Sequence, residues 1–121
     1  MESKYRVFLI GGNSLIGCAV LKGIKLRYKD VEVFKFVRKK NSLDNNIIEL
    51  KNYKDSINKI ESLIDDDKKN IYILSFGVLN EENTHQDLLK NLKNHIEIKA
   101  YDTLFLMRGF KSLKNFHEIH I

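Results

Sequence analysis

Residues 5–17 read Tyr-Arg-Val-Phe-Leu-Ile-Gly-Gly-Asn-Ser-Leu-Ile-Gly. The stretch opens with a β-branched and aromatic run, residues 5–10, which is typical of a buried parallel strand. It then passes through two glycines into a segment whose apolar residues recur at helical spacing. Asn13 and Ser14 are residue types that commonly cap the start of a helix. This order predicts a strand, a tight turn and a helix that begins directly above the end of the strand.

The glycine turn is the segment most informative about function. A glycine at a strand end lets the chain turn sharply, so that the first N–H groups of the helix and its positive dipole end point above the strand. Phosphate is the natural occupant of such a position, and a glycine on the first helical turn lets helix and strand pack closely. The alternative is a glycine-rich turn that binds no ligand. The residues that we expect to contact a bound phosphate group are Gly11, Asn13, Ser14, Leu15, Ile16 and Gly17.

Further along the chain, strand-like and helix-like segments alternate. We expect further strands at residues 31–37, 47–50, 71–74 and 117–121. We expect helices at residues 14–27, 55–64 and roughly 86–112, the last broken near His95. Such alternation predicts an α/β fold, a Rossmann-like parallel sheet of about five strands with helices on both faces and right-handed crossovers.

Apolar residues at helical spacing predict which side of each helix is buried. For the first helix, the expected apolar positions are Leu15, Ile16, Ala19, Val20, Gly23 and Ile24. In the last helix, Tyr101, Met107 and Phe110 are expected to pack in the core. We also expect that these two helices stay partly uncovered and that the fifth strand presents an open edge. The chain is therefore expected either to associate with itself or with a complementing chain, or to be poorly soluble.

Length and composition limit the classes of protein to consider. The chain has 121 residues, of which 43% are hydrophobic and 31% charged, and it contains one Cys. These values predict a single domain, residues 1–121, and exclude collagen-like, disulfide-scaffold and fully disordered chains. No apolar run reaches the ~18 residues of a membrane-spanning helix. With no visible signal peptide and Cys18 as the single cysteine, we expect a cytoplasmic protein.

The net charge of +5 raises the question of a nucleic-acid partner. The 21 Lys and Arg residues are scattered among 16 acidic residues and form no single basic stripe. We therefore interpret the excess as a solvated surface and expect no nucleic-acid binding. Nucleic-acid binding ranks last among the alternatives.

The sequence Arg38-Lys39-Lys40 follows the second predicted strand, about 20 residues beyond the glycine turn, where a dinucleotide-binding fold reads the adenosine ribose. An acidic residue there would accept a hydrogen bond from the 2′-hydroxyl of NAD, whereas a guanidinium suits the 2′-phosphate of NADP. The charges therefore favour NADP over NAD. The alternative is that these are ordinary solvated loop cations.

The chain resembles the N-terminal half of the short-chain dehydrogenase/reductase superfamily. Residues 11–17 look like the family's glycine-rich loop, with Leu15 or Ser14 in place of the middle glycine, and Arg38, with Lys39 beside it, matches the NADP-selecting basic position. Residues 75–79 lie where the family has Asn-Asn-Ala-Gly. The resemblance implies that Phe76 and Gly77 flank the ribose on the nicotinamide side, and that the parent activity is hydride transfer between NADP(H) and a carbonyl or alcohol.

The resemblance lacks the catalytic residues. Family members use a Ser and a Tyr-x-x-x-Lys pair that lie after the fifth strand, and none of the five Tyr residues here is followed by Lys at that spacing. We therefore name no catalytic residue and expect a truncated, nucleotide-binding half with no turnover of its own. The alternatives are a regulatory or nucleotide-binding module that acts with a partner chain, and a non-functional gene remnant. No metal site is expected, because His117 and His120 are three apart on a strand and should face opposite sides.

Overall fold

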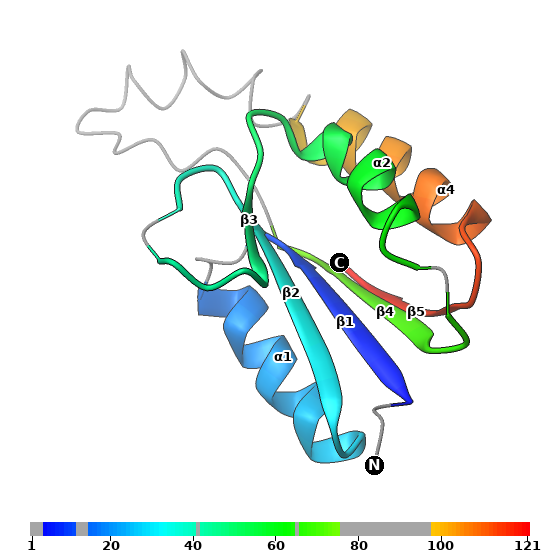
Figure 1. Ribbon diagram of the computed structural model, residues 1–121. Helices are drawn as coiled ribbons and strands as arrows, with labels where there is room; N and C mark the ends of the chain where they lie inside the picture. Colours follow the sequence, from blue (N-terminus) through cyan, green and yellow to red (C-terminus); the bar gives the residue numbers. More distant parts are fainter. Residues whose placement is uncertain (1–3, 12–14, 41, 65, 76–97) are drawn as a thin grey trace.

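A computed structural model of the chain describes residues 4–11, 15–40, 42–64, 66–75 and 98–121. Five strands form one sheet in the order β3-β2-β1-β4-β5, and every neighbouring pair is parallel. The strands are β1 (Tyr5–Ile10), β2 (Val31–Val37), β3 (Ile47–Glu49), β4 (Lys69–Leu74) and β5 (Phe116–His120). Figure 1 shows the sheet with helices on its two faces. The predicted Rossmann-like α/β architecture is confirmed.

The helices divide between the two faces of the sheet (Figure 1). One face is covered by α1 (Leu15–Arg27), and the other by α2 (Ser56–Glu61) and α4 (Thr103–Ser112). A short 3-10 turn, Tyr53–Asp55, precedes α2, and a π-helical turn, Ile98–Asp102, precedes α4. In the described residues, no helix is long and apolar enough to cross a membrane.

Most predicted boundaries hold within a few residues, and β1 and β2 match throughout. The fourth strand begins two residues earlier than expected, because the N–H of Lys69 donates to the Lys4 carbonyl and the N–H of Asn70 donates to that of Asn115. The second helix is shorter than predicted and ends at Glu61. The expected break near His95 lies outside the described residues.

Side-chain alternation along the strands builds one core on each face. Even-numbered residues of β1 and β4 point toward α2 and α4, where the ring of Tyr72 stacks on Phe110 with centroids 4.4 Å apart. Odd-numbered residues point toward α1, where Val7, Leu9, Ile71 and Ile73 pack against the helix. Both faces of β1 and β4 are therefore buried, as expected of central parallel strands.

The buried side of α1 differs from the predicted one. Gly17, Leu21 and Ile24 are buried, whereas Leu15 and Ile16 are 89% and 75% exposed. Gly17 faces the sheet, and Leu15 lies two residues away, ~200° around the helix axis. The close packing of Gly17 thus fixes the rotation of the helix, and by the same rotation Ala19 and Gly23 are exposed.

A β-bulge in β5 corrects the prediction that His117 and His120 face opposite sides. Asn70 pairs with Phe116 and Ile71 pairs with Glu118, so His117 is an extra residue that shifts the side-chain alternation. The Nε2 atoms of His117 and His120 consequently lie 3.7 and 2.9 Å from the Glu118 carboxylate. Over the described ranges, no three His, Cys, Asp or Glu side chains are placed to hold one metal ion.

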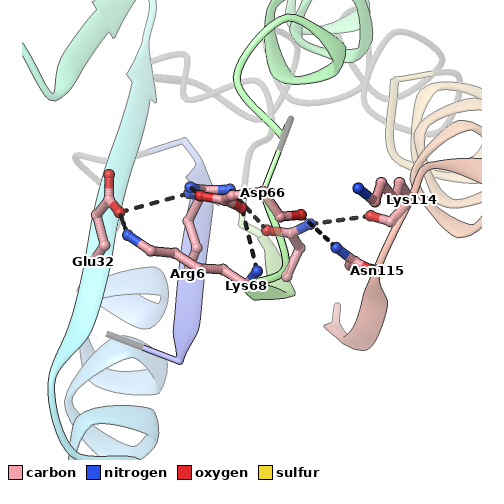
Figure 2. Close-up of polar contacts among 7 residues, drawn as sticks. Arg6, Glu32, Asp66, Lys68, Lys114 and Asn115 are labelled. Carbon is pink, nitrogen blue, oxygen red and sulfur yellow. Dashed lines mark hydrogen bonds and ion pairs between the residues drawn. The ribbon is translucent and has the colours of Figure 1, made fainter. Parts of the chain in front are cut away.

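A buried arginine joins the strands at their amino ends (Figure 2). Arg6 is 4% exposed, and its guanidinium donates to both carboxylate oxygens of Asp66, at 3.2 and 2.5 Å. It also lies 3.4 Å from the side-chain oxygen of Asn70 and 3.8 Å from the Glu32 carboxylate, which pairs in turn with Lys68. A buried charge with several partners of this kind is costly to disturb.

Two asparagines extend this network to the turn between α4 and β5 (Figure 2). The side-chain amide of Asn70 donates to the Lys114 carbonyl at 3.1 Å, and that of Asn115 donates to the Asp66 carbonyl at 2.8 Å. Asn115 has a φ of 62°, a left-handed conformation that Asn tolerates better than most residues. At the amino edge of the sheet these polar side chains therefore hold the strands and the turn together. The candidate functional site lies at the opposite, carboxyl edge.

Candidate functional site

The candidate site lies at the carboxyl edge of the sheet, where parallel strands β1, β2 and β4 all end. In open α/β sheets ligands bind outside this edge, near the point where the chain order reverses. Here β1 lies between β2 and β4, and the connections from β1 to β2 and from β4 to β5 run in opposite directions along the sheet. The end of β1 is therefore the switch point of this fold.

Gly11 makes the turn that the sequence predicted. Its φ is 95°, in a region that residues with a side chain rarely adopt, and its N–H donates to the Phe36 carbonyl at 2.9 Å. The bond continues the β1–β2 ladder by one residue before the chain leaves the sheet. The backbone at Gly11 is consequently held against β2 just before the start of α1.

Gly17 brings the first turn of α1 into close contact with the ends of β1 and β4. A Cβ atom at this position would lie 2.2 Å from the Ser75 Oγ, 2.9 Å from the Ser75 Cβ and 3.0 Å from the Leu9 Cδ1. Ser75 is itself fixed, because its N–H donates to the Ile10 carbonyl at 3.0 Å and its Oγ lies 3.2 Å from the Gly11 carbonyl. The helix can approach the sheet this closely only because position 17 has no side chain.

Leu15 and Ile16 begin the helix and are largely exposed, so this apolar pair lies at the surface beside the glycine turn. Helix α1 has 13 residues and no acidic residue in its first turn. The partial positive charge at the amino end of the helix is therefore not neutralised by a carboxylate of its own first turn.

Arg38 and Lys39 directly follow β2 and are exposed. Arg38 lies beside Tyr53 of the 3-10 turn. Burial raises the pKa of the Tyr53 phenol, and the charge and the backbone of Arg38 partly oppose that rise. Because β2 pairs with β1, these two cations at the end of β2 lie at the same edge of the sheet as the Gly11 turn.

Sequence reasoning missed two residues at this edge, Tyr53 and Glu49. Glu49 ends β3, and its Oε1 accepts a hydrogen bond from the Lys40 N–H at 2.9 Å. The signal for Glu49 was available, because a residue at the end of a parallel strand belongs to the same edge as the ends of β1 and β2. Tyr53 left no comparable signal, since only the packing of the 3-10 turn brings it to Arg38.

The structure therefore brings together only part of the predicted set. Gly11 and Gly17 meet around Ser75, and Arg38 and Lys39 lie at the adjacent strand end. The predicted residues Asn13, Ser14, Phe76 and Gly77 lie outside the described residues.

Comparison with known proteins finds similarity in structure alone. No protein-family model matches the sequence, and no curated protein matches it. A crystal structure of a short chain dehydrogenase family protein from Francisella tularensis subsp. tularensis SCHU S4 matches with a TM-score of 0.57 and 16% identity, over 96% of this chain. A short chain dehydrogenase from Leptospira borgpetersenii serovar Hardjo-bovis (strain JB197), solved with bound NAD+, matches with a TM-score of 0.51 and 15% identity, over 89% of this chain.

Both structures contain the fold described here. This chain has a Rossmann-like fold that these short chain dehydrogenases share. It spans just under half of those proteins, 47% of one and 45% of the other. At this level of identity the likeness shows the fold alone. The similarity therefore supports the Rossmann-like assignment and the position of the switch point, while function must be argued from the residues of this chain.

The residues at the switch point fit a phosphate group on structural grounds. In Rossmann-type folds a phosphate group binds at a helix amino end that packs closely on a strand end. The contact of Gly17 with Ser75 and Leu9 meets this requirement, and the positive φ of Gly11 provides the turn. The exposed cations after β2 add positive charge on the adjacent strand.

Proposed function

We propose that this chain binds a nicotinamide dinucleotide at the carboxyl edge of its sheet. The observation that carries the proposal is the packing of Gly17, which brings the start of α1 within van der Waals reach of β1 and β4. The pyrophosphate would lie over residues 11–17, held by backbone N–H groups and the helix dipole. Gly77 and Phe76 would lie on the nicotinamide side, as the family resemblance implies.

We further propose that NADP is preferred over NAD. Arg38 and Lys39 offer two exposed cations where the adenosine ribose would lie, and Arg can bind a phosphate through two parallel hydrogen bonds. The nearby carboxylate of Glu49 already accepts the Lys40 N–H through its Oε1. This arrangement favours recognition of a 2′-phosphate on the adenosine ribose over recognition of a free 2′-hydroxyl. When bound, the cofactor would supply a hydride donor or acceptor for a carbonyl or alcohol.

The second candidate function is a dinucleotide-binding module that does not turn the cofactor over by itself. It is favoured by a sequence observation: no Tyr in these 121 residues is followed four positions later by Lys. General acid–base catalysis needs a positioned proton donor, and the sequence lacks the pair that supplies it in short-chain dehydrogenases. The residues on which both candidates depend, Gly17 and Arg38, are the same.

Titration calorimetry with NADPH and NADH tests the binding proposal. The wild-type chain is expected to bind NADPH at least about tenfold more tightly than NADH, since one charge-assisted phosphate contact contributes ~1.5–3 kcal/mol. Arg38→Ala should remove most of that preference and leave the Kd for NADH nearly unchanged.

The matched control is Arg108→Ala, which removes an exposed Arg from α4 on the far side of the sheet's core. It should leave both dissociation constants within about twofold of wild type. Equal affinity for NADPH and NADH in the wild-type chain would show that the NADP preference is wrong. The absence of binding by either nucleotide to a chain that is folded by circular dichroism would remove the whole proposal.

A further inference from the structure

Helix α1 carries large apolar side chains on the side that faces away from the sheet. Leu15 and Leu26 are 89% and 87% exposed, although the opposite side of the same helix packs on β1 and β4. Eleven residues separate them, so they lie about 20° apart around the helix axis and roughly 16 Å apart along it. No described helix or strand covers this side of α1 (Figure 1). The two leucines therefore mark the two ends of one exposed ridge.

Between the leucines, the ridge carries one cation and two small residues. Lys22 is exposed and lies within about 40° of both leucines around the axis. Ala19 and Gly23 are also exposed, and their side chains are too small to project beyond the leucines. We call Leu15, Ala19, Lys22, Gly23 and Leu26 the outer ridge of α1. A flat surface laid along the outer ridge can therefore contact both leucines at once.

The charges around the outer ridge all have one sign. Residues 15–29 contain no Asp or Glu and four cations, Lys22, Lys25, Arg27 and Lys29. Arg27 pairs with Glu118 at 2.7 Å, whereas no ion pair in the described part of the chain involves Lys22 or Lys25. The outer ridge thus combines uncompensated positive charge with exposed apolar side chains.

The second exposed apolar surface of the protein differs from the outer ridge in its charges. Near α4, Tyr101, Leu104 and Phe105 are 68%, 54% and 51% exposed, so the prediction that Tyr101 packs in the core is wrong. The reason is that Leu106 and Phe110 bury the opposite side of α4 against the sheet. This surface borders the carboxylate of Asp102, which the Nζ of Lys54 contacts at 3.1 Å. Acid and base therefore occur together here, and Leu104 offers a matched control for the leucines of α1.

The outer ridge matches an anionic membrane surface more closely than a protein or a nucleic acid. The core of a protein interface is depleted of charged residues, whereas Lys22 separates the two leucines here. Nucleic-acid phosphates would pair with the lysines but would leave both leucines in water. A bilayer surface takes single apolar side chains into its headgroup boundary, and its anionic lipids attract nearby cations.

We infer that α1 docks lengthwise on an anionic membrane surface, with Leu15 and Leu26 entering the headgroup boundary and Lys22 and Lys25 facing the anionic lipids. The contact is peripheral and involves no segment that crosses the bilayer. Leu26 lies at the end of α1 remote from the glycine turn, roughly 16 Å along the axis from Leu15. Variants at Leu26 therefore test membrane docking separately from nucleotide binding.

Insertion of the outer ridge can be followed by fluorescence, because the chain contains no Trp and a single introduced Trp reports its own surroundings. With vesicles that contain about 30% phosphatidylserine, the emission of Leu26→Trp should shift to shorter wavelength as the ring enters the headgroup region. Vesicles of phosphatidylcholine alone should cause little shift, because they carry no net charge. The matched control is Leu104→Trp on α4, whose emission should stay unchanged with either kind of vesicle.

Co-sedimentation with the same vesicles measures the charge requirement. The double variant Lys22→Gln with Lys25→Gln should weaken binding at least about tenfold, since each cation near an anionic surface contributes about fivefold. The control double variant Lys59→Gln with Lys111→Gln removes the same charge from exposed positions on α2 and α4, which cover the other face of the sheet. It should bind within about threefold of wild type, because salt screens charges remote from the membrane.

Circular dichroism with a thermal melt verifies that each variant is folded. Equal losses in the two double variants would show attraction by net charge alone and would overturn the inference. A wild-type chain that does not sediment with the anionic vesicles, or a Leu26→Trp emission that they leave unchanged, would overturn it equally. A chain that binds a DNA duplex and not the vesicles would assign Lys22 and Lys25 to a nucleic acid, which also contradicts membrane docking.

Discussion

At the scale of single residues, two glycines on one helix have different roles. A side chain at Gly17 would meet Ser75 and Leu9, whereas a Cβ at Gly23 would have nothing within 4 Å. The same substitution therefore has opposite expected effects at two positions six residues apart on α1. This contrast separates the general preference of helices for Ala over Gly from the packing that brings α1 onto the strand ends.

Gly17→Ala is expected to destabilise the protein by ~1–3 kcal/mol, because α1 must shift to accommodate the Cβ. Gly23→Ala should stabilise it by ~0.5–1 kcal/mol through helix propensity alone. Urea unfolding of the two variants measures both effects. Adding Ser75→Gly to Gly17→Ala removes the closest contact and should recover part of the loss. An equally stable Gly17→Ala chain would show that the close approach of α1 is not required.

At the scale of elements, two polar clusters join segments that are distant in sequence. Arg6 on β1 connects to Asp66 before β4, and Glu118 on β5 connects to Arg27 and Tyr28 at the end of α1. Hydrogen bonding from Arg6 lowers the pKa of Asp66. Burial by itself would raise the pKa of Glu118, but hydrogen bonds from Tyr28 and His120 and the charge of Arg27 outweigh it and lower the pKa.

A lowered carboxyl pKa in the folded state predicts a defined response to acid. The unfolded state binds protons first, so both carboxylates stabilise the fold above their unfolded pKa values and lose that contribution as the pH falls through the folded values. The free energy of unfolding should therefore fall as the pH drops below about 5. Each exposed or half-exposed group should contribute no more than ~1 kcal/mol of this fall.

Thermal melts between neutral and acid pH measure the response. Asp66→Asn and Glu118→Gln should each lower the melting temperature at neutral pH and flatten its decline in acid. The control is Asp67→Asn, an exposed neighbour of Asp66 with no ion pair among the described residues. If Asp67→Asn flattened the decline as much as Asp66→Asn, the Arg6 network would not be its source.

At the scale of the whole molecule, the chain has a proposed nucleotide site but lacks the catalytic pair of the short-chain dehydrogenases that it resembles. The structure provides the carboxyl edge of a Rossmann-like sheet, while the 121 residues contain no Tyr-x-x-x-Lys pair. Binding and turnover therefore separate as two measurable properties of this chain.

We expect this polypeptide alone to show no NADPH oxidation above the uncatalysed rate with a panel of aldehydes and ketones. A general acid or base contributes ~10²–10⁴-fold to such a reaction, and the sequence has no Tyr-x-x-x-Lys pair to take that role. The measurement follows NADPH absorbance at a nucleotide concentration that saturates the chain in calorimetry. Clear turnover that Arg38→Ala slows would contradict the expectation and identify an active enzyme.

The local patterns of the sequence were sufficient for the order of elements and for the glycine turn. Alternation in β1 and β2, and the glycine run that follows β1, are set by neighbours in the chain, so their bounds and the turn at Gly11 match the prediction. The phosphate-loop residues Asn13 and Ser14 remain predictions. NADP preference and a partner chain also remain predictions, because binding has not been tested.

Only the tertiary structure decided which side of each helix is buried and which residues meet at the carboxyl edge. Leu15 and Tyr101 fit an apolar helical stripe as well as Leu21 and Phe110 do, and the sequence contains nothing that ranks them. Packing ranks them, because a helix has one rotation at which it approaches the sheet most closely. Gly17 sets that rotation for α1, and Leu106 with Phe110 sets it for α4. The sequence thus determined the Rossmann-like order of strands and helices, and the packing of helix on sheet determined which side chains remain exposed.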